Sequence, residues 1–553
     1  MLKRTLSTFL AVLMLLFTLS AYAQEAAMTP GTYTAVCRGF YGDFDVAVTV
    51  SETAITEITV GEYQETEAIG GEALRIMTDR MLASNTAAVD TVSGATVTSA
   101  VFRAAVSQAL KEAGAPAALT TAPEAPTKAD ETVETDVLVI GAGAAGFSAA
   151  IAAKNAGANV VLIEKQDLLG GSTLVSAGIV YAALDKDDEA KMVDYYMERA
   201  EGKADREMLQ TFAENSLDTI AFLESIGVQW MMSVPAGTAS EPRARFSMHE
   251  DGTAMIGSAL TQPMEAKALS LGVEILKGVK ATQLLQQDGA IVGAVAESKE
   301  KNYTFNAKAV VLATGGFDAS AELVAKYAPV AIGDVVLSNK GNVGEGLVMA
   351  IEAGAATKFN NGMIGFQAVS QALPESGYNA VVMNAPLFVQ GDGTFISLGA
   401  DYPINYTNLK KSGASSFFAI SDVAGESNGE RAIAVNFGYK ADTIEELAAA
   451  TGMDAAKLAD AIGQAEALTT APYYAVVARP ATIGSMGGIV TNTGAEVLAE
   501  ATGEPIPGLY AAGEVANPGF YYQEYPASGS SNSISMTFGR IAGVNAVEYI
   551  QGK

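Results

Sequence analysis

The alternation of apolar and polar residues predicts a small module of strands and one helix near the N-terminus. Three stretches within residues 31–69, TYTAVCRG, FDVAVTV and ITEITVGEY, alternate with a period of two and are separated by glycines and polar turns, which is typical of an antiparallel meander. Residues 98–112 then show the apolar spacing of a helix that opens at Thr98 or Ser99 and stops at Gly114. We expect residues 31–113 to form a small α+β domain.

The pattern changes after a linker that is rich in proline and alanine. Residues 114–134 read GAPAALTTAPEAPTKADETVE, which favours an extended tether. From residue 135 onward the order is strand, glycine turn, helix and strand, the pattern of an α/β domain. VVLATGG and IPGLYAAGEV, far apart in the chain, both read as buried strands that end in glycines. We therefore expect residues 135–360 and 476–550 to form one Rossmann-like domain, with an inserted α+β capping domain at 361–475.

The first residues have the layout of a signal peptide. Lys3 and Arg4 precede an apolar run of about 15 residues, and the run ends in Ala21-Tyr22-Ala23. This layout predicts cleavage after residue 23 and export to the outer side of a bacterial membrane. No later stretch is long and apolar enough to span a bilayer.

Composition excludes several classes of chemistry. The 553 residues include 34 basic and 62 acidic ones, with a formal net charge of −28, so nucleic acid is not expected as a partner. Because Cys37 is the single cysteine, an internal disulfide, a cysteine-ligated iron–sulfur cluster and a CxxCH haem site are excluded. We expect no metal, and any redox chemistry must use an organic cofactor.

A glycine turn between a strand and a helix marks a dinucleotide site. Strand ETDVLVI runs into GAGAAG at residues 141–146, which opens the helix FSAAIAAKNAG, and the strand NVVLIEK follows. In this arrangement the first two glycines allow a tight turn and close approach of a pyrophosphate, and the third lets the helix touch the strand. Glu164 falls where an acidic side chain accepts hydrogen bonds from ribose hydroxyls.

Further motifs indicate FAD. LLGGSTLVSAGIVYAA at 168–183 would let the backbone follow an FAD chain, and ATGGF, MGGIV and the helix NSISMTFGRIAG come later. With these motifs, residues 135 to 550 resemble the fumarate reductase, succinate dehydrogenase and urocanate reductase flavoprotein family. The resemblance implies FAD contacts at Glu514 and at the start of the last helix, whose positive end would stabilise an anionic reduced flavin. The expected non-covalent FAD site comprises Gly141, Gly143, Ala145, Gly146, Glu164, Lys165, Gly171, Ser172, Thr173, Gly178, Gly315, Glu514, Asn532, Ser533 and Ile534. There is no second fingerprint for NAD(P)H.

A hydroxyl-rich stretch, DTVSGAT at residues 90–96, suggests a second flavin. It resembles the flavinylation motif of FMN-binding domains, in which a flavin transferase esterifies the FMN phosphate to the final threonine. The matching residues are Asp90, Ser93, Gly94, Ala95 and Thr96, so Thr96 is the expected attachment site. The alternative is a capping loop for the following helix. With two flavins, electrons would pass from a membrane-associated quinol or flavoprotein donor through FMN to FAD.

The cations that clamp dicarboxylates in the fumarate-reducing relatives have no counterparts at the positions we align. The stretch SGYNAVVMNA offers Tyr378, ADYPINYTN offers Tyr402, and Gly484 and Ser528 stand where a histidine and an arginine are expected. Each missing charge-assisted pair is worth roughly 1.5–3 kcal/mol. The sequence therefore disfavours fumarate and, less strongly, urocanate.

Aromatic hydroxyls replace those cations. Tyr525-Pro526-x-x-Gly529 resembles the segment of 3-ketosteroid dehydrogenases in which a Tyr hydroxyl and a Gly N–H bind the substrate ketone. Two neutral donors on one carbonyl oxygen form an oxyanion hole, which suits an enone. The expected reaction is hydride transfer from reduced FAD to the β-carbon, followed by protonation of the α-carbon by a second tyrosine. The candidate proton donors are Tyr378, Tyr402, Tyr406, Tyr521 and Tyr522.

The leading hypothesis is an exported FMN/FAD reductase that acts on an α,β-unsaturated carbonyl compound, such as a 3-oxosteroid. Three alternatives remain open: a dehydrogenase that works in the opposite direction, a reductase of unsaturated acids such as urocanate, fumarate or acrylate, and an electron carrier without a substrate. His249, the single histidine, either serves a loop or contacts substrate or flavin.

Overall fold

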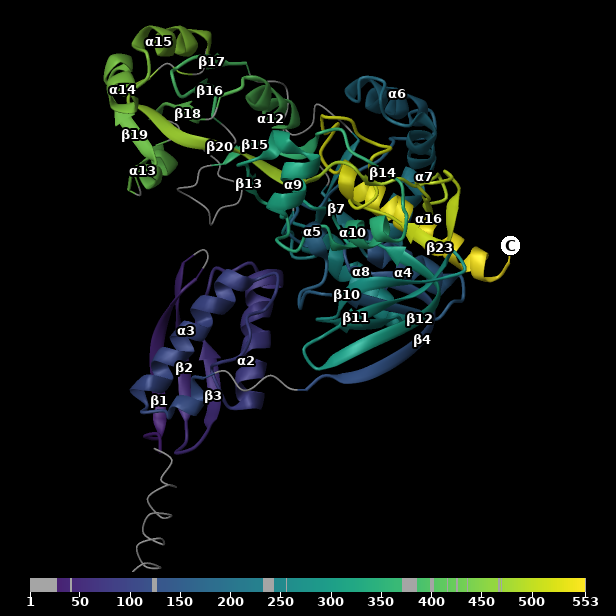
Figure 1. Ribbon diagram of the computed structural model, residues 1–553. Helices are drawn as coiled ribbons and strands as arrows, with labels where there is room; N and C mark the ends of the chain where they lie inside the picture. Colours follow the sequence, from purple (N-terminus) through teal and green to yellow (C-terminus); the bar gives the residue numbers. More distant parts are fainter. Residues whose placement is uncertain are drawn as a thin grey trace, which may run out of the picture. The chain divides into compact units, whose positions relative to one another are not determined.

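The computed structural model divides into two compact units, Met1–Pro126 and Thr127–Lys553, and each is described by itself (Figure 1). None of the described helices is long and apolar enough to cross a membrane. The structure describes residues 27–39, 42–121, 127–231, 243–254, 256–369, 385–397, 402–414, 416–423, 426–434, 436–465, 468 and 470–552. The signal peptide expected at residues 1–23 lies outside this part of the chain.

The first unit is a three-stranded antiparallel meander packed against two helices. Strands β1 (Gly31–Arg38), β2 (Asp43–Val50) and β3 (Ile55–Val60) lie in that order, and α3 (Thr96–Glu112) packs on β1 and β2. Helix α2 (Glu72–Ser84), which follows the short helix η1 (Glu67–Gly71), packs on β3. The inward side chains of β2, among them Val46 and Val48, are fully buried. The alternation in the sequence therefore produces the predicted α+β module.

The N-cap of helix α3 lies three or four residues before Thr98 or Ser99, the caps that the sequence predicts, and no side chain caps the helix. Its N-cap position is Ala95, and Thr96 is the first helical residue. The Ser99 hydroxyl donates to the Ala95 carbonyl (2.8 Å) and accepts the Val92 N–H (3.1 Å). Because these bonds hold the preceding loop against the first turn, the helix can start without a capping side chain.

The expected linker at 114–134 is shorter in the structure. Residues Ala117–Leu119 form a 3₁₀ turn, and the Leu119 carbonyl accepts the Ala87 N–H (2.9 Å), which ties this turn to the first unit. At the other end, β4 (Ala129–Ile140) already pairs with its neighbour from Ala129 onward. Because β4 pairs with β12 (Lys301–Leu312) from Ala129 onward, the sheet includes residues that composition alone predicts to be linker.

The second unit is built on a parallel sheet. Its parallel strands run in the order β9 (Glu274–Lys277), β5 (Val160–Glu164), β4, β12 (Lys301–Leu312) and β23 (Pro505–Ala511), as in a doubly wound fold. Strands β10 (Lys280–Gln287) and β11 (Ala290–Glu297) extend it antiparallel beside β12, and β22 (Glu496–Leu498) pairs with β23. The two expected glycine-ended strands are therefore neighbours, although nearly two hundred residues separate them.

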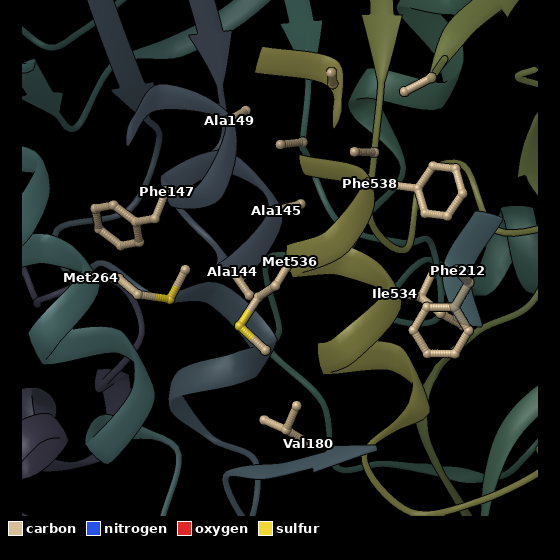
Figure 2. Packing of buried hydrophobic residues seen from close by; sticks show 14 of the residues in the cluster. Ala144, Ala145, Phe147, Ala149, Val180, Phe212, Met264, Ile534, Met536 and Phe538 are labelled. Atoms are coloured by element: carbon tan, nitrogen blue, oxygen red, sulfur yellow. The ribbon is translucent and has the colours of Figure 1, made fainter. Parts of the chain in front are cut away.

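Helices α4 (Ala144–Asn155) and α16 (Ser530–Ile550) cross in backbone contact, and this contact joins the beginning and the end of the second unit. A Cβ atom on Gly539 would lie 2.3 Å from the Ala145 carbonyl oxygen, and one on Gly543 would lie 2.2 Å from that of Ala149. Figure 2 shows Ala145 and Ala149 pointing from α4 toward α16. At positions 539 and 543 only glycine allows this approach.

A second sheet carries the expected capping region. Strand β20 (Tyr473–Ser485) is central and pairs with β13 (Val335–Val336), β15 (Met363–Val369), β18 (Phe417–Ser421) and β19 (Gly438–Ala441). Since β20 is continuous through residue 475, the boundary expected at 475/476 falls inside a strand. Strand β18 also pairs with β16 (Leu387–Gln390), and β16 pairs with β17 (Phe395–Ile396). The helices of this region are α12 (Tyr402–Lys411), α13 (Glu426–Ala434), α14 (Ile444–Thr451) and α15 (Ala455–Gln464).

The remaining elements surround the parallel sheet. Helices are α5 (Gly171–Leu174), α6 (Glu189–Arg199), α7 (Arg206–Ser225), α8 (Ser258–Ser270), α9 (Ala321–Tyr327), η3 (Pro329–Ala331) and α10 (Glu345–Glu352). Strands β6 (Ile179–Tyr181), β8 (Ala244–Met248) and β7 (Gln229–Trp230) form a small antiparallel sheet, and β14 (Thr357–Lys358) pairs with β21 (Gly488–Ile489).

We expect Gly539→Ala to lower the apparent melting temperature, because the new methyl group would force α16 away from α4 at a cost of about 1–3 kcal/mol. Thermal unfolding followed by circular dichroism measures the change. Gly463→Ala in α15 is the matched control, since a Cβ there meets nothing within 4 Å; it should leave the melting temperature equal or slightly higher. Equal melting of both variants would contradict the contact.

Candidate active site

One cavity runs along the carboxyl ends of the parallel strands in the second unit. This is the edge at which doubly wound sheets bind ligands. Residues from both expected halves of the FAD domain line it. Its walls come from Ile140, Gly141, Gly143, Ala144, Ala145, Ile163, Glu164, Lys165, Gln166, Gly171, Ser172, Thr173, Val175, Ser176, Ala177, Ile179, Val279, Lys280, Ala281, Ala313, Thr314, Gly315, Leu337, Ser338, Asn339, Gly341, Asn342, Glu345, Met349, Ile364, Ile483, Gly513, Glu514, Tyr525, Gly529, Ser531, Asn532 and Ser535.

The glycines of the GAGAAG turn have different tasks. Gly141 has φ +103°, and a Cβ atom on it would lie 2.3 Å from the Ala313 carbonyl oxygen. A Cβ on Gly146 would lie 1.8 Å from the carbonyl oxygen of Gly141, so this glycine serves the packing of α4 and does not line the cavity. At Gly143, the N-cap of α4, the nearest atom would be 3.8 Å away. The turn therefore leaves space for a ligand directly in front of the helix N-terminus.

Glu164 closes one end of this turn. Its two carboxylate oxygens accept the backbone N–H groups of Ala142 (2.8 Å) and Gln166 (2.9 Å). Burial raises the pKa of the Glu164 carboxyl, and these two hydrogen bonds oppose that shift. Each oxygen keeps a lone pair for a further donor, so a ribose hydroxyl fits the same carboxylate.

The ammonium group of Lys165 binds a neighbouring carboxylate. Its ammonium group donates to Glu345 and to the carbonyl of Gly341 (2.6 Å). Lys280 approaches the same Glu345 at 3.1 Å. The two lysines that line the cavity therefore share one anionic partner near Glu164.

Asn532 organises the opposite end, at the start of α16. Its side-chain oxygen accepts the Thr173 hydroxyl (3.1 Å), and its amide nitrogen donates to the Ile179 carbonyl (3.0 Å) and to Ser176 (3.3 Å). The first turn of this 21-residue helix thus lies at the cavity wall, to which Ser531 and Asn532 contribute. Such an end stabilises negative charge on a ligand.

Tyr525 and Gly529 lie together on this wall. The Tyr525 hydroxyl oxygen accepts the Ser531 N–H at 2.8 Å, and Gly529, with φ +87°, is the N-cap of α16. No described residue accepts a hydrogen bond from the Gly529 N–H. Burial raises the pKa of the Tyr525 phenol, so it stays protonated at neutral pH. Both residues line the cavity, and each carries a neutral hydrogen-bond donor.

Two tyrosines of α6 form hydrogen bonds with the turn between Tyr525 and Gly529 and its next residue. The Tyr195 hydroxyl donates to the Pro526 carbonyl (2.7 Å). The Tyr196 hydroxyl donates to Ser530 (2.5 Å), whose own hydroxyl donates to the Ala527 carbonyl (2.8 Å). These bonds fix the backbone that carries both donors.

Several predicted site residues lie elsewhere. Gly178, with φ +62°, packs against Ser247, and Ser533 and Ile534 are buried within α16, so none of the three lines the cavity. Tyr522 is half-buried against the main core, outside the cavity lining. Tyr378 lies outside the described residues, and Tyr402 begins α12.

Two further candidates have structural partners. The Tyr406 hydroxyl donates to Asp334 (2.8 Å), which also binds Lys410 (2.6 Å), so Tyr406 fixes α12 to the segment before β13. The His249 ring contacts Ser258 (2.9 Å) at the start of α8, which places it in a loop role. Tyr521 is buried with its ring against that of Tyr525 (5.6 Å between centroids).

The sequence reasoning missed part of the wall. Asn339, Gly341 and Asn342 come from the segment NKGNVGEG before α10, whose glycine and asparagine content resembles the other cavity loops. That composition could have indicated that the segment lines the cavity. Ile364 and Ile483 belong to β15 and to β20, and nothing in their local sequence distinguishes them from core residues.

In the first unit, the motif at 90–96 forms an exposed turn. Gly94 has φ +99°, and Thr96 is exposed at the first position of α3. Arg80 and Arg103 hold the turn by donating to the carbonyls of Asp90 (3.3 Å) and Val89 (3.2 Å). The Thr96 hydroxyl is therefore accessible on a fixed backbone, with Ser93 and Ala95 beside it.

The cavity fits FAD. Its glycine turn provides the space for a pyrophosphate in front of α4, and Glu164 offers carboxylate oxygens beside that turn. A family model for the FAD binding domain matches residues 136–531. The chain belongs to this family of FAD-binding flavoproteins. A model for the FMN-binding domain matches residues 39–111 of the flavoprotein.

Curated relatives agree with this membership. The flavoprotein is 32% identical to a probable fumarate reductase, Ifc3, of Shewanella frigidimarina over 76% of each chain. It is 26% identical to the urocanate reductase of Eggerthella lenta over 95% of its own length and 94% of that protein. It is an FAD-dependent oxidoreductase of the fumarate reductase type that also carries an FMN-binding domain.

A solved structure shows the same fold. The 3-ketosteroid-Δ4-(5α)-dehydrogenase of Rhodococcus jostii, in complex with 4-androstene-3,17-dione, is 25% identical to the flavoprotein. It matches with a TM-score of 0.62 over 76% of this chain and 99% of that one.

We expect Glu164→Gln to weaken FAD binding roughly fivefold to thirtyfold, because the amide nitrogen cannot accept one of the two backbone N–H groups, a loss of about 1–2 kcal/mol. Fluorescence titration of the apoprotein with FAD measures the affinity. Glu297→Gln, which removes a surface carboxylate, is the control and should bind like the native protein. Unchanged affinity in the Glu164 variant would exclude the carboxylate from the site.

Proposed function

We propose that the protein is an exported FMN- and FAD-dependent reductase of α,β-unsaturated carbonyl compounds. The observation that carries this proposal is the placement of Tyr525 and Gly529 on the wall of the FAD cavity as two neutral hydrogen-bond donors. When bound, FAD supplies the hydride for the β-carbon of the substrate. The protein polarises the carbonyl and holds the negative charge that develops on its oxygen.

The hydrogen bonds of Tyr525 suit this role. Its oxygen already accepts the Ser531 N–H, which leaves the phenol proton for a second partner. The helix N-terminus behind that oxygen makes the hydroxyl a stronger donor. Tyr195 and Tyr196 prevent the turn from relaxing, so both donors are positioned before the substrate arrives.

The distribution of positive charge argues against a dicarboxylate. Lys165 and Lys280 are the cations among the described residues that line the cavity, and both bind Glu345. No described arginine lines it. Between Thr127 and Gly552, the segments outside the described residues contain no Lys, Arg or His. A second carboxylate would thus enter an acidic protein without a guanidinium partner.

Six arginines of the second unit have other partners among the described residues. Arg199 pairs with Glu524, Arg206 with Asp194, and Arg243 with Asp188. The guanidinium groups of Arg245, Arg479 and Arg540 donate to Ala182, Gly333 and Thr219, respectively.

Part of the cavity wall is apolar. Ile179, Ile364 and Ile483 line the cavity from three different segments. Such walls bind a flat hydrocarbon skeleton by removing its surface from water. A bulky neutral enone, such as a 3-oxosteroid, fits this combination of isoleucines and two donors, and the ketosteroid dehydrogenase fold supports it.

The electron input would be a covalent FMN on Thr96. The exposed threonine on the Gly94 turn and the match to the FMN-binding domain support attachment by a flavin transferase. With export, the electrons would come from a membrane-associated quinol or flavoprotein system. A tyrosine, with Tyr378 and Tyr402 as candidates, would protonate the α-carbon.

One alternative has a specific observation in its favour. The urocanate reductase of E. lenta aligns with nearly the whole chain, and other related reductases act by name on fumarate and acrylate. An unsaturated acid is therefore the second candidate. Anaerobic reoxidation of the dithionite-reduced protein by enones, cinnamates, urocanate and fumarate decides: fastest reoxidation by fumarate or urocanate would reject the neutral substrate.

We expect Tyr525→Phe to reduce turnover of the best enone by on the order of tenfold or more, since one of two oxyanion donors is lost. Stopped-flow reoxidation of the reduced protein measures it, with the FAD content of each sample determined first. Tyr439→Phe on β19 is the control for a tyrosine of the other sheet. Turnover equal to that of the native protein would remove Tyr525 from the mechanism.

Thr96→Ala should abolish covalent flavin, because an alanine cannot form a phosphoester. In-gel fluorescence of the denatured protein, expressed together with a flavin transferase, reports the attachment. Thr91→Ala changes a hydroxyl within the same motif and should keep the fluorescence. A fluorescent band in the Thr96 variant would place the flavin elsewhere.

A further inference from the structure

Two carboxylates, Glu514 and Asp318, are buried at the edge of the sheet next to the donor pair. Glu514 follows β23 and Asp318 follows β12, and these two strands are parallel neighbours. The residues are 8% and 2% exposed. Glu514 lines the FAD cavity, and Asp318 lies behind the wall formed by Ser338 and Asn342.

Neutral groups satisfy both carboxylates. One oxygen of Glu514 accepts the N–H (2.5 Å) and the hydroxyl (3.0 Å) of Ser485, and the Ser485 hydroxyl oxygen accepts the Phe317 N–H (3.1 Å). Asp318 accepts the Ser338 hydroxyl and the amide of Asn342 (3.2 Å).

The space around Glu514 is filled. A Cβ on Gly316 would lie 2.0 Å from the carboxylate oxygen Oε1 of Glu514, and one on Gly484 would lie 3.1 Å from it. The carboxylate is therefore fixed between two glycines. It also occupies the space that a larger side chain at position 484 would need.

Neither carboxylate forms an ion pair among the described residues, which is unusual for buried acids. The charged and titratable groups that act on Glu514 are Asp318 and Tyr525, and Lys340 acts on Asp318. Burial raises the pKa of both carboxyls, and the charge of Asp318 raises that of Glu514 further. Ionising both carboxyls at neutral pH would cost free energy, because two negative charges would then lie close together in a buried site.

We propose that Glu514 and Asp318 form a proton-exchanging pair that balances the charge of the FAD site. Glu514 takes one proton from solvent when two electrons from the reduced donor enter the bound cofactor. It releases that proton when the electrons leave for the substrate. Glu514 is the group in contact with the cavity, and Asp318 is a positioning residue that sets the pH at which the exchange occurs.

The balance of charge gives the reason. Two electrons and one proton convert oxidised FAD to its anionic reduced form, which adds one negative charge beside a carboxylate with no cation. Protonation of Glu514 removes one negative charge and restores the net charge of the site. The N-terminus of α16 favours the anionic cofactor, so the second proton goes to the carboxylate. This inference requires FAD in the cavity but does not depend on the identity of the substrate.

Proton uptake on reduction tests the proposal. The FAD- and FMN-loaded protein is reduced anaerobically in weak buffer with a pH indicator, from about pH 5 to about pH 9, the range over which raised carboxyl pKa values fall. The native protein should take up close to one proton more per two electrons than Glu514→Gln within a defined pH window. In Asp318→Asn the window should move to lower pH by about one unit or more, since the repulsion that raises the Glu514 pKa is gone.

Infrared spectra provide a readout that needs no turnover. The stretching band of a buried protonated carboxyl should appear in the native protein, strengthen on reduction and be lost in Glu514→Gln. Asp334→Asn is the matched control, because Asp334 is also buried but pairs with Lys410; it should keep the native uptake and window. If Glu514→Gln fails to retain FAD, the position of the window in Asp318→Asn decides. An unchanged window in that variant would overturn the proposal, whatever substrate the enzyme reduces.

Discussion

The close contact of α4 with α16 is the constraint on which the cofactor site depends. The glycine turn that begins α4 and the N-cap of α16 are separated by nearly four hundred residues. They face the same cavity because Gly539 and Gly543 let the two backbones touch at Ala145 and Ala149. A larger side chain at either glycine would separate the phosphate-binding end of the site from its donor end. Small residues thus carry a geometric role that no hydrogen bond could replace.

The chemistry of the site follows from a balance between acidic groups and neutral donors. Membership in a family that includes a probable fumarate reductase leads one to expect cationic clamps. The described cavity instead combines Tyr525, the Gly529 N–H and five isoleucines with lysines that pair with Glu345. The same flavin scaffold can therefore serve different substrates, because hydrogen-bond donors stabilise an enolate oxygen without attracting a carboxylate.

The buried carboxylate of Glu514 lies next to a position at which a substrate cation is expected. Gly484 stands where our alignment expects a substrate histidine, and the neighbouring volume is occupied by Glu514. Among the described residues no cation pairs with Glu514, and the proposed proton exchange gives that arrangement a role. Proton exchange would also give a reason for the position of Glu514 and Asp318, which follow neighbouring strands and are shielded from water.

The sequence by itself determined the two folded units, the meander, the dinucleotide turn and the position of Thr96, because these depend on local periodicity and on glycines at fixed spacing. It also indicated Tyr525 and Gly529, since both lie within one short turn. Tertiary structure alone decided that Ser533, Ile534 and Gly178 stay behind the wall, and that Tyr406 binds Asp334. It likewise decided that β20 crosses the expected domain boundary and that β4 extends into the expected linker. These features arise from pairing between distant strands and from packing in three dimensions, and neither leaves a periodic signal in the chain.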